Sequence, residues 1–300
     1  MSRGPFHILV VDDEPVMRHL LRDLLRMRGH CVRTAADGRE ALSVVCTESV
    51  DMVISDIQMP EMDGFTLLSV LEAEYPSIRR VLMTGCEIDG YLGLIREYNI
   101  GNVLSKGGDF HLEEIASYID RLLCGTVFGL GPYFEGEASD SVNVFCQDDC
   151  ERACSRVLSL YRGADRVFLE MALNELVSNA VFHGVLRMSG VPRERWSNCY
   201  RIGSRDPVKV TWMSDDEKVG IGVEDPVGAL SKKDVLRWLD HPIGDENPGE
   251  EHGRGLMLVR RLIDRLIINI DPGVRTECIV LQYHERRDEH RKKPLLIHEL

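Results

Sequence analysis

Within the first 106 residues, five polar side chains each stand at the end of a short apolar run: three carboxylates, a threonine and a lysine. They are Asp12, Asp13, Asp56, Thr84 and Lys106. Carboxylates that are brought together repel one another unless a divalent cation neutralises them, and such oxygen ligands favour Mg²⁺. A lysine ammonium and a threonine hydroxyl suit the oxygens of a transferred phosphoryl group, which Asp56 can accept as a nucleophile. One such acidic residue is usually a solvated turn residue, but five side chains at successive strand ends predict a phosphoryl-transfer site.

A second group of polar residues lies on a predicted helix over residues 165–186. Glu175, Asn179 and His183 are spaced by four, so a regular α-helix places them on one face. Such a stripe is usually the solvated side of a helix. However, Asn179 has apolar neighbours, and a glutamate one turn from an asparagine can orient a water molecule and ligate a metal ion. We expect His183 to be structural.

Two later segments carry residues that suit a nucleotide. Asp225 ends a strand predicted at 219–224, and Gly253 and Gly255 open a helix predicted at 256–262. Glycines at the start of a helix let backbone N–H groups close on phosphates at the positive end of the helix. By itself this glycine pair is weak evidence, and it gains weight from Glu175 and Asn179 upstream.

Short β-branched runs alternate with amphipathic segments through residues 6–124. The predicted strands are 6–11, 30–34, 52–55, 80–83 and 103–104, and the predicted helices are 15–28, 39–46, 65–74, 89–98 and 111–123. Five such pairs predict an α/β fold with a doubly wound, five-stranded parallel sheet, because each crossover must return the chain to the same edge. Ligands of this architecture lie beyond the carboxyl ends of the strands, where the five polar residues are placed.

The segments ILVVDDEP, VISDIQMPEMDG, VLMTG and VLSKG resemble the flavodoxin-like receiver domain of bacterial two-component response regulators, over residues 5–124. The resemblance implies that Asp56 is the phosphoacceptor and that Thr84 and Lys106 contact the phosphoryl group. The Mg²⁺ ligands that it implies are Asp12, Asp13, Asp56 and the backbone carbonyl of Gln58. It also implies that Pro60 and Gly64 shape the loop after the third strand.

Two positions depart from the receiver pattern. Val103 stands where receivers commonly carry an aromatic switch residue, and Gly107 stands where a proline usually follows the lysine. We expect the phosphorylation chemistry to survive both changes. How a signal reaches the later helices stays open, because the moving ring of the usual two-state account is absent.

Residues 125–140 are rich in glycine and are predicted to be a linker to a second domain at 141–284. The predicted strands of that domain are 141–146, 208–213, 219–224, 267–270 and 278–283, and its predicted helices are 148–161, 165–186 and 256–262. Helices followed by adjacent antiparallel strands predict an α/β sandwich. No element is predicted for 192–206 or for the charged tail at 285–300, whose basic residues alternate with acidic ones and favour a solvated segment.

The order of E-x-x-x-N, a strand with a terminal aspartate, and G-x-G-L before a helix resembles the GHKL ATPase superfamily. Within it, ELVSNAVFHG and EEHGRGLMLVRRLIDRL look most like the anti-sigma-factor serine kinases, over about residues 139–284. The resemblance implies an ATP pocket in which Asp225 reads the adenine amino group, Asn179 binds Mg²⁺ and Glu175 orients water as a base.

The same resemblance places Gly253 and Gly255 under the phosphates. The middle motif departs from the family pattern D-x-G-x-G, because Val227 and Ala229 replace its glycines and Gly228 stands between them. Valine in such a turn can narrow an adenine pocket or force another backbone conformation. Residues 185–207 form an insertion without a counterpart in the compact family domain.

Composition bounds the classes of function. The chain has 300 residues, of which 44% are hydrophobic and 28% charged, as in an ordinary globular protein large enough for two domains. The net charge of -13, spread over both halves, argues against a broad phosphate-binding surface, and no basic recognition helix is evident, so nucleic acid is not an expected partner.

The N-terminus shows no signal pattern and no window is apolar enough to span a bilayer, so we expect a cytoplasmic protein without a membrane partner. The nine cysteines are odd in number and scattered, which favours reduced thiols. Cys146, Cys150 and Cys154 are spaced by four. We expect buried apolar side chains there rather than a metal site, because no fourth ligand lies nearby.

These residues predict a response regulator that a sensor histidine kinase phosphorylates on Asp56. Its output would be an ATP-binding serine kinase of the anti-sigma type, with a sigma factor or an anti-sigma antagonist as partner. The alternative is a pseudokinase that turns over no ATP and acts as a phosphorylation-gated binding switch. A hybrid histidine kinase is disfavoured, because no helix with a phosphoacceptor histidine separates the domains. A homodimer is possible.

Overall fold

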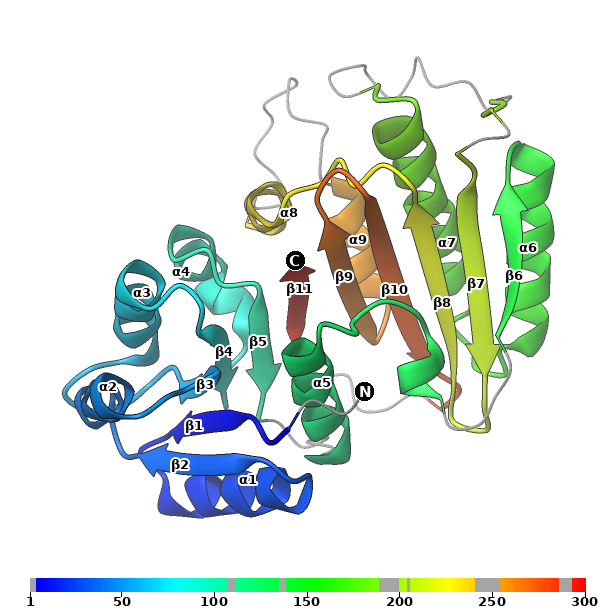
Figure 1. Cartoon of the computed structure of the whole chain (residues 1–300). Helices are drawn as coiled ribbons and strands as arrows, with labels where there is room; N and C mark the ends of the chain where they lie inside the picture. The colour runs from blue at the N-terminus through cyan, green and yellow to red at the C-terminus, as the bar shows by residue number, and fades with distance from the viewer. Residues whose placement is uncertain are drawn as a thin grey trace. The chain divides into compact units, whose positions relative to one another are not determined.

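The computed structural model describes residues 4–106, 112–134, 139–188, 200–203, 206–240, 254–285 and 293–300. The chain forms two compact units that divide after Val127; residues 291–296 belong to the first unit and 297–300 to the second. Figure 1 shows the elements of both units. None of the helices in the described ranges is both long and apolar enough to cross a membrane.

The first unit is built on a parallel sheet in the order β2-β1-β3-β4-β5 (Figure 1). Its strands are β1 (His7–Val11), β2 (Cys31–Ala35), β3 (Met52–Asp56), β4 (Arg79–Thr84) and β5 (Asn102–Ser105). Its helices are α1 (Pro15–Met27), α2 (Gly38–Thr47), α3 (Gly64–Glu74), the 3-10 turn η1 (Ile88–Tyr91), α4 (Leu92–Glu97) and α5 (Leu112–Cys124). The predicted doubly wound five-stranded sheet is confirmed.

Local chemistry explains where the helices of this unit begin. Pro15 opens α1, because its fixed φ suits the first helical turn and its missing N–H is not needed there. The Asp37 side chain caps α2 by accepting N–H bonds from Arg39 and Glu40, and Asp63 caps α3 in the same way. On the inner face, Leu21, Leu24 and Leu25 of α1 are buried.

The second unit has an antiparallel sheet in the order β9-β10-β8-β7-β6. Its strands are β6 (Asp140–Val144), β7 (Val208–Ser214), β8 (Lys218–Asp225), β9 (Arg265–Asp271) and β10 (Arg275–Tyr283). Three helices, α6 (Gln147–Leu160), α7 (Arg166–Asn179) and α9 (Arg254–Leu262), pack side by side and against these strands. Figure 1 shows them behind the sheet. The predicted α/β sandwich is confirmed.

Two features of this unit differ from the prediction. A helix that the sequence analysis missed, α8 (Lys232–Leu239), starts at Ser231, whose hydroxyl accepts the N–H of Asp234. The long helix predicted at 165–186 is divided: α7 ends at Asn179 and a π-helical segment, η3 (Ala180–Val185), follows. His183 therefore lies in the π segment and not in a regular continuation of the helix that carries Glu175 and Asn179.

The segments predicted to be a linker and a solvated tail contain regular structure. Within 125–140, residues 128–134 belong to the second unit, and Leu130 and Phe134 are buried there around the short 3-10 turn η2 (Gly131–Tyr133). The tail forms β11 (Leu295–Glu299), in which Leu295 and Leu296 pair with β5. Its apolar residues are buried, so this part of the tail is not solvated. Residues 135–138 and 286–292 lie outside the described ranges, as does most of the insertion at 185–207.

The cysteines of α6 behave as buried apolar side chains. Burial raises the pKa of Cys150 to about 12 and that of Cys154 to about 11, so both thiols stay protonated at neutral pH. In the described part of the chain, no group of metal-ligating side chains includes them. The interpretation as small buried hydrophobes fits Cys150 and Cys154. It does not fit Cys146, directly before α6, which is half-buried and whose thiol donates to Oδ2 of Asp149 at 3.3 Å.

The loop after β3 depends on a glycine at the start of α3. The N–H of Gly64 donates to the carbonyl of Ile57 at 3.0 Å, and a Cβ atom on Gly64 would lie 2.1 Å from the carbonyl oxygen of Asp56. Pro60 contributes its carbonyl to a tight turn that Met62 closes at 2.6 Å. Gly64 and Pro60 therefore shape this loop, as predicted, and hold Asp56 at the end of β3.

We expect Gly64→Ala to destabilise the first unit by about 1–3 kcal/mol, because its methyl group would push against rigid backbone. Gly90→Ala is the matched control, since a Cβ atom there meets nothing within 4 Å. Thermal unfolding of the chain would be followed by circular dichroism, and fluorescence of the three tryptophans, all beyond residue 190, would report unfolding of the second unit separately. A Gly64→Ala chain that unfolds like the control would contradict the steric account.

Candidate functional site

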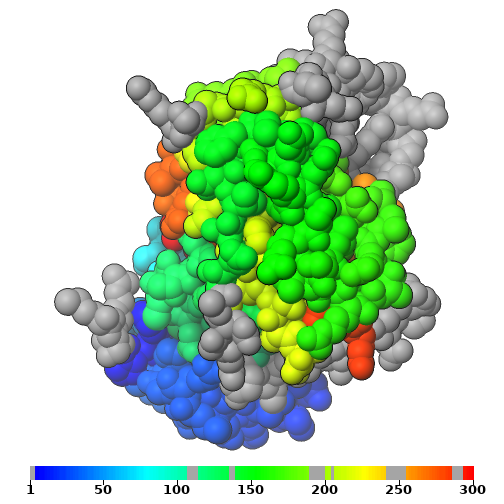
Figure 2. Space-filling model, turned by 90° about the vertical axis from the view of Figure 1, so that its right-hand side faces the viewer, coloured from blue at the N-terminus to red at the C-terminus, as the bar shows by residue number. Residues whose placement is uncertain are grey.

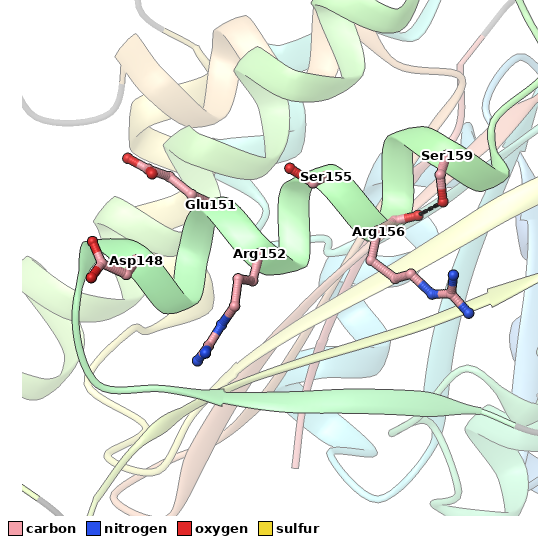
Figure 3. A pocket seen from close by; sticks show the side chains of 6 residues that line it. All are labelled: Asp148, Glu151, Arg152, Ser155, Arg156 and Ser159. Carbon is pink, nitrogen blue, oxygen red and sulfur yellow. Dashed lines mark hydrogen bonds between the residues drawn. The ribbon is translucent and has the colours of Figure 1, made fainter.

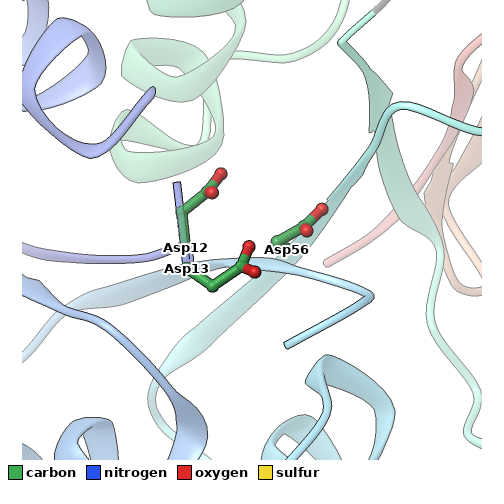
Figure 4. A group of neighbouring side chains, drawn as sticks. All are labelled: Asp12, Asp13 and Asp56. Atoms are coloured by element: carbon green, nitrogen blue, oxygen red, sulfur yellow. The ribbon is translucent and has the colours of Figure 1, made fainter. Parts of the chain in front are cut away.

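Three carboxylates meet beyond the ends of β1 and β3. One oxygen from each of Asp12, Asp13 and Asp56 lies within 4.8 Å of the others (Figure 4). Asp12 and Asp56 are at most 9% exposed, whereas Asp13 is open to solvent. The parallel strands bring residues from distant parts of the chain to one edge, as the sequence predicts.

Lys106, directly after β5, binds two of the three carboxylates. Its Nζ atom lies 2.5 Å from Oδ2 of Asp12 and 2.9 Å from Oδ1 of Asp56. Burial lowers the pKa of Lys106, but its bonds to the two carboxylates outweigh this effect and raise the pKa. Burial raises the pKa of Asp56, and Lys106 opposes that rise. One ammonium group cannot balance three carboxylates, so the donor set fits a divalent cation such as Mg²⁺.

Thr84 completes the predicted set at the end of β4. It follows Met83, which pairs with Asp56 across β4 and β3, and it is 2% exposed. Its hydroxyl accepts the N–H of Cys86 at 3.0 Å, and its carbonyl accepts the N–H of Lys106 at 2.7 Å. The structure therefore brings all five side chains predicted from the sequence to one end of the sheet.

Tyr91 is a residue of this site that the sequence analysis missed. The side-chain amide of Gln58 donates to its hydroxyl at 3.0 Å, and both residues line a pocket of about 490 Å³ with Asp13 and Phe65. Burial is the main cause that raises the pKa of Tyr91. No spacing in the sequence links Tyr91 to Gln58, which is 33 residues away.

Val103, where receivers commonly carry an aromatic residue, is fully buried in β5.

The second group of predicted residues centres on Asp225 at the end of β8. Asp225 is 5% exposed, and burial raises its pKa. Its Oδ1 atom accepts the N–H groups of Val227 at 3.0 Å and Gly228 at 3.1 Å, which oppose the rise. Thr276, which the sequence analysis also missed, pairs with Asp225 across β10 and β8, and its hydroxyl also opposes the rise in the pKa of Asp225.

The turn after Asp225 keeps a glycine where the backbone requires one. Gly228 has a φ of 61°, and a Cβ atom there would lie 2.4 Å from the carbonyl oxygen of Asp271. Its own carbonyl accepts the N–H of Gly273 at 3.0 Å. Val227 is half-buried and Ala229 is exposed. The valine and the alanine are thus compatible with a turn that the Asp225 side chain and the β9–β10 hairpin hold in place.

Two glycines mark close contacts around the buried Glu175 and Asp225. A Cβ atom on Gly255, in α9, would lie 1.7 Å from Oε1 of Glu175, and one on Gly184, in η3, would lie 2.9 Å from Cγ of Asp225. Asn179, one turn after Glu175, ends α7 where the π segment begins. These residues therefore belong to one region between α7, α9 and β8. Gly253 lies outside the described residues.

A further pocket, of about 600 Å³, lies on the outer face of α6. Figure 2 shows this face of the second unit in green, and Figure 3 shows the side chains that line the pocket. They are Asp148, Glu151, Arg152, Ser155, Arg156 and Ser159. Charges of both signs alternate here, and the Ser159 hydroxyl bonds to the carbonyl of Arg156 in its own helix. We interpret this face as a solvated helix surface.

Comparisons with known proteins match both units. The model of the response regulator receiver domain matches residues 8–120, and the model of the histidine kinase-like ATPase domain matches residues 162–282. The transcriptional regulatory protein GlrR of Escherichia coli (strain K12) is 42% identical over 84 residues, which are 28% of this chain and 19% of GlrR. The sensor histidine kinase RcsC of Salmonella typhimurium is 50% identical over 66 residues, 22% of this chain and 7% of RcsC.

The chain thus spans only 19% of GlrR and 7% of RcsC. Among solved structures, the chemotaxis response regulator CheY4 of Vibrio cholerae shares 28% sequence identity, with 39% of this chain and 98% of that chain covered and a TM-score of 0.37. The two family models fall on separate units, one on the parallel sheet with its carboxylates and the other on the antiparallel sheet with Asp225. The chain therefore contains a response regulator receiver domain fused to a histidine kinase-like ATPase domain.

Proposed function

We propose that the chain is a response regulator that is phosphorylated on Asp56 and thereby controls an ATP-binding output domain. The observation that carries this proposal is the cluster of three carboxylates within 4.8 Å, two of them bound to Lys106. A buried nucleophile, a set of oxygen ligands and a fixed ammonium group are the parts that phosphoryl transfer to a carboxylate needs.

In this proposal Asp12, Asp13, Asp56 and the backbone carbonyl of Gln58 hold Mg²⁺, which supplies positive charge for the phosphoryl oxygens. An oxygen of Asp56 forms a bond to phosphorus while the bond between phosphorus and the donor nitrogen breaks, and the donor keeps the electron pair. Lys106 and Thr84 stabilise the charge on the phosphoryl oxygens. Lys106 already contacts Asp56, so little reorganisation is required of it.

The proposed donor is a sensor histidine kinase. This assignment is supported by the receiver domain itself and by the similarity to a segment of the sensor histidine kinase RcsC. It agrees with the exposure of Asp13 and Gln58, which leaves the pocket beside Asp56 accessible from solvent.

For the second domain we propose an ATP site with Asp225 as acceptor for the adenine amino group. Thr276 and Gly228 flank that carboxylate, and Asn179 would hold Mg²⁺ with the nucleotide. Glu175 would orient a water molecule or a substrate hydroxyl, and Gly255 would lie under the phosphates with Gly253. The close approaches of Gly184 to Asp225 and of Gly255 to Glu175 support this assignment, because a side chain at either glycine would collide with the carboxylate and displace it.

More specifically, we propose that this domain is a serine kinase of the anti-sigma type and that its partner is a sigma factor or an anti-sigma antagonist. This proposal rests on the resemblance of residues 175–184 and 250–266 to that family. The second candidate is a pseudokinase that binds partners without turning over ATP. One observation favours it: the half-buried Val227 replaces a glycine in the turn beside Asp225.

We expect the intact chain to take up one phosphoryl group from acetyl phosphate in the presence of Mg²⁺. Asp56→Asn should abolish the labelling, and Lys106→Met should slow it by about 10²-fold, because it loses the ammonium group that stabilises the transferred charge. Intact-mass spectrometry measures the uptake. Asp23→Asn on the outer face of α1 is the control. Equal labelling of Asp56→Asn and wild type would refute the assignment of the phosphoacceptor.

We expect Glu175→Gln to lower ATP turnover by about 10²- to 10⁴-fold while the affinity for Mg–ATP stays within threefold, because a general base acts on the chemical step. Release of radiolabelled phosphate and transfer to protein substrates would be measured in parallel with nucleotide binding. Glu170→Gln, an exposed position on the same helix, is the matched control. Wild-type chain that binds ATP but shows no turnover would establish the pseudokinase instead.

A further inference from the structure

Residues 128–134, here called the strap, cover the face of the ATPase sheet that is opposite its helices. Along β8, Asp225 points to the helix side, where it meets Gly184, so Gly220 and Gly222 face the other side. On that side a Cβ atom on Gly220 would lie 2.5 Å from the ring of Phe134. Figure 1 shows the segment after α5 in front of β10 and β8. The two glycines thus make room for the strap.

Polar anchors fix the first residues of the strap to β10. The Arg275 guanidinium lies 3.8 Å from the centroid of the Phe128 ring and forms an ion pair with Glu224 at 3.2 Å. The N–H of Gly129 donates to Oε2 of Glu277 at 2.8 Å. These contacts select one position of the strap on the sheet, which apolar packing of Leu130 and Phe134 alone would not do.

The strap supplies a hydrogen bond that a buried carboxylate needs. Glu277 is 5% exposed, and its Oε2 atom is bonded by Gly129 and, at 3.3 Å, by the side-chain amide of Asn269. A buried carboxylate that loses such a donor must find water or move. Departure of the strap would therefore disturb β10 at Glu277.

The residues that hold the strap are adjacent to those of the nucleotide site. Glu277 follows Thr276 in β10 and points to the opposite face of the sheet. Thr276 pairs with Asp225, and Glu277 pairs with Glu224. Two successive cross-strand pairs therefore carry the strap contacts on one face and the proposed adenine contacts on the other, without any intervening side chain.

We propose that docking of the strap and binding of nucleotide are thermodynamically coupled, so that the docked strap favours nucleotide at Asp225 and its release weakens binding. The proposal rests on the proposed ATP site. Coupling of this kind is reciprocal, and nucleotide must then stabilise the docked strap to the same extent. Because only residues 125–127 separate α5 of the receiver from Phe128, a movement of α5 would act on the strap through the chain itself.

The test combines hydrogen exchange with binding on the intact chain. Exchange of the strap amides would be measured by mass spectrometry with and without saturating Mg–ADP, and the Kd for Mg–ADP would be measured by calorimetry. The variants are Phe128→Ala, which removes the ring from Arg275, and Arg275→Gln, which removes the cation. Phe128→Tyr keeps the ring and should restore wild-type behaviour. Phe6→Ala, a half-buried aromatic residue beside His30, is the control.

We expect Mg–ADP to slow exchange of the Gly129 amide at least threefold in wild type. Phe128→Ala and Arg275→Gln should exchange faster in the strap and bind Mg–ADP at least threefold more weakly. Faster exchange together with an equal or lower Kd would overturn the coupling and leave the ATP site intact. If neither wild type nor any variant binds Mg–ADP, the proposed ATP site fails and the coupling with it.

Discussion

The charge balance among Asp12, Asp13, Asp56 and Lys106 is the constraint on which the first unit depends. Two largely buried carboxylates beside a third are unfavourable without cations, and Lys106 supplies only one positive charge. The fold brings these groups together because the ends of β1, β3 and β5 meet at one edge of the parallel sheet. The rest of the unit serves this arrangement: Gly64 lets α3 start directly beneath the Asp56 carbonyl, and Thr84 joins the ends of β4 and β5. A divalent cation would complete the balance.

The second unit also contains a buried carboxylate that needs stabilising partners. Asp225 is buried, and backbone N–H groups of the following turn donate to its carboxylate. A glycine at 228, where φ is positive, is what this turn needs, so the replacement of its neighbours by Val227 and Ala229 leaves the turn in place. The strap and the proposed nucleotide residues then share two cross-strand pairs of β8 and β10. This gives the chain a short physical route from the residues after α5 to Asp225.

Much of the fold and of the first site follows from the sequence, because the signals are local. Strand ends marked by Asp12, Asp56 and Thr84 need only the alternation of strands and helices to be placed on one edge. The features that were missed depend on contacts distant in the chain. Tyr91 meets Gln58 only when η1 folds over the β3 loop, and Leu295 and Leu296 become part of a strand only because β5 offers a partner.

Other misses have a different physical origin. The π segment after Asn179 has no residue pattern that distinguishes it from an α-helix, so the sequence of Ala180–Val185 predicts that the helix continues. The strap contains glycines that suggest a linker. Its Leu130 and Phe134 are nevertheless buried, because Gly220 and Gly222 of β8 leave room for them on the sheet. A glycine-rich sequence can therefore belong to a packed segment as well as to a linker, and only the three-dimensional contacts separate the two cases.

Control of the ATPase domain by phosphorylation at Asp56 is tested most directly by calorimetric titration of Mg–ATP into the intact chain, with and without beryllofluoride bound at Asp56 as a phosphoryl mimic. We expect a Kd for Mg–ATP that changes at least threefold with the mimic in wild type and not in Asp56→Asn, because a ligand shifts an equilibrium only by its differential affinity for two states. The same Kd in both states, from a folded chain that binds Mg–ATP and the mimic, would contradict it.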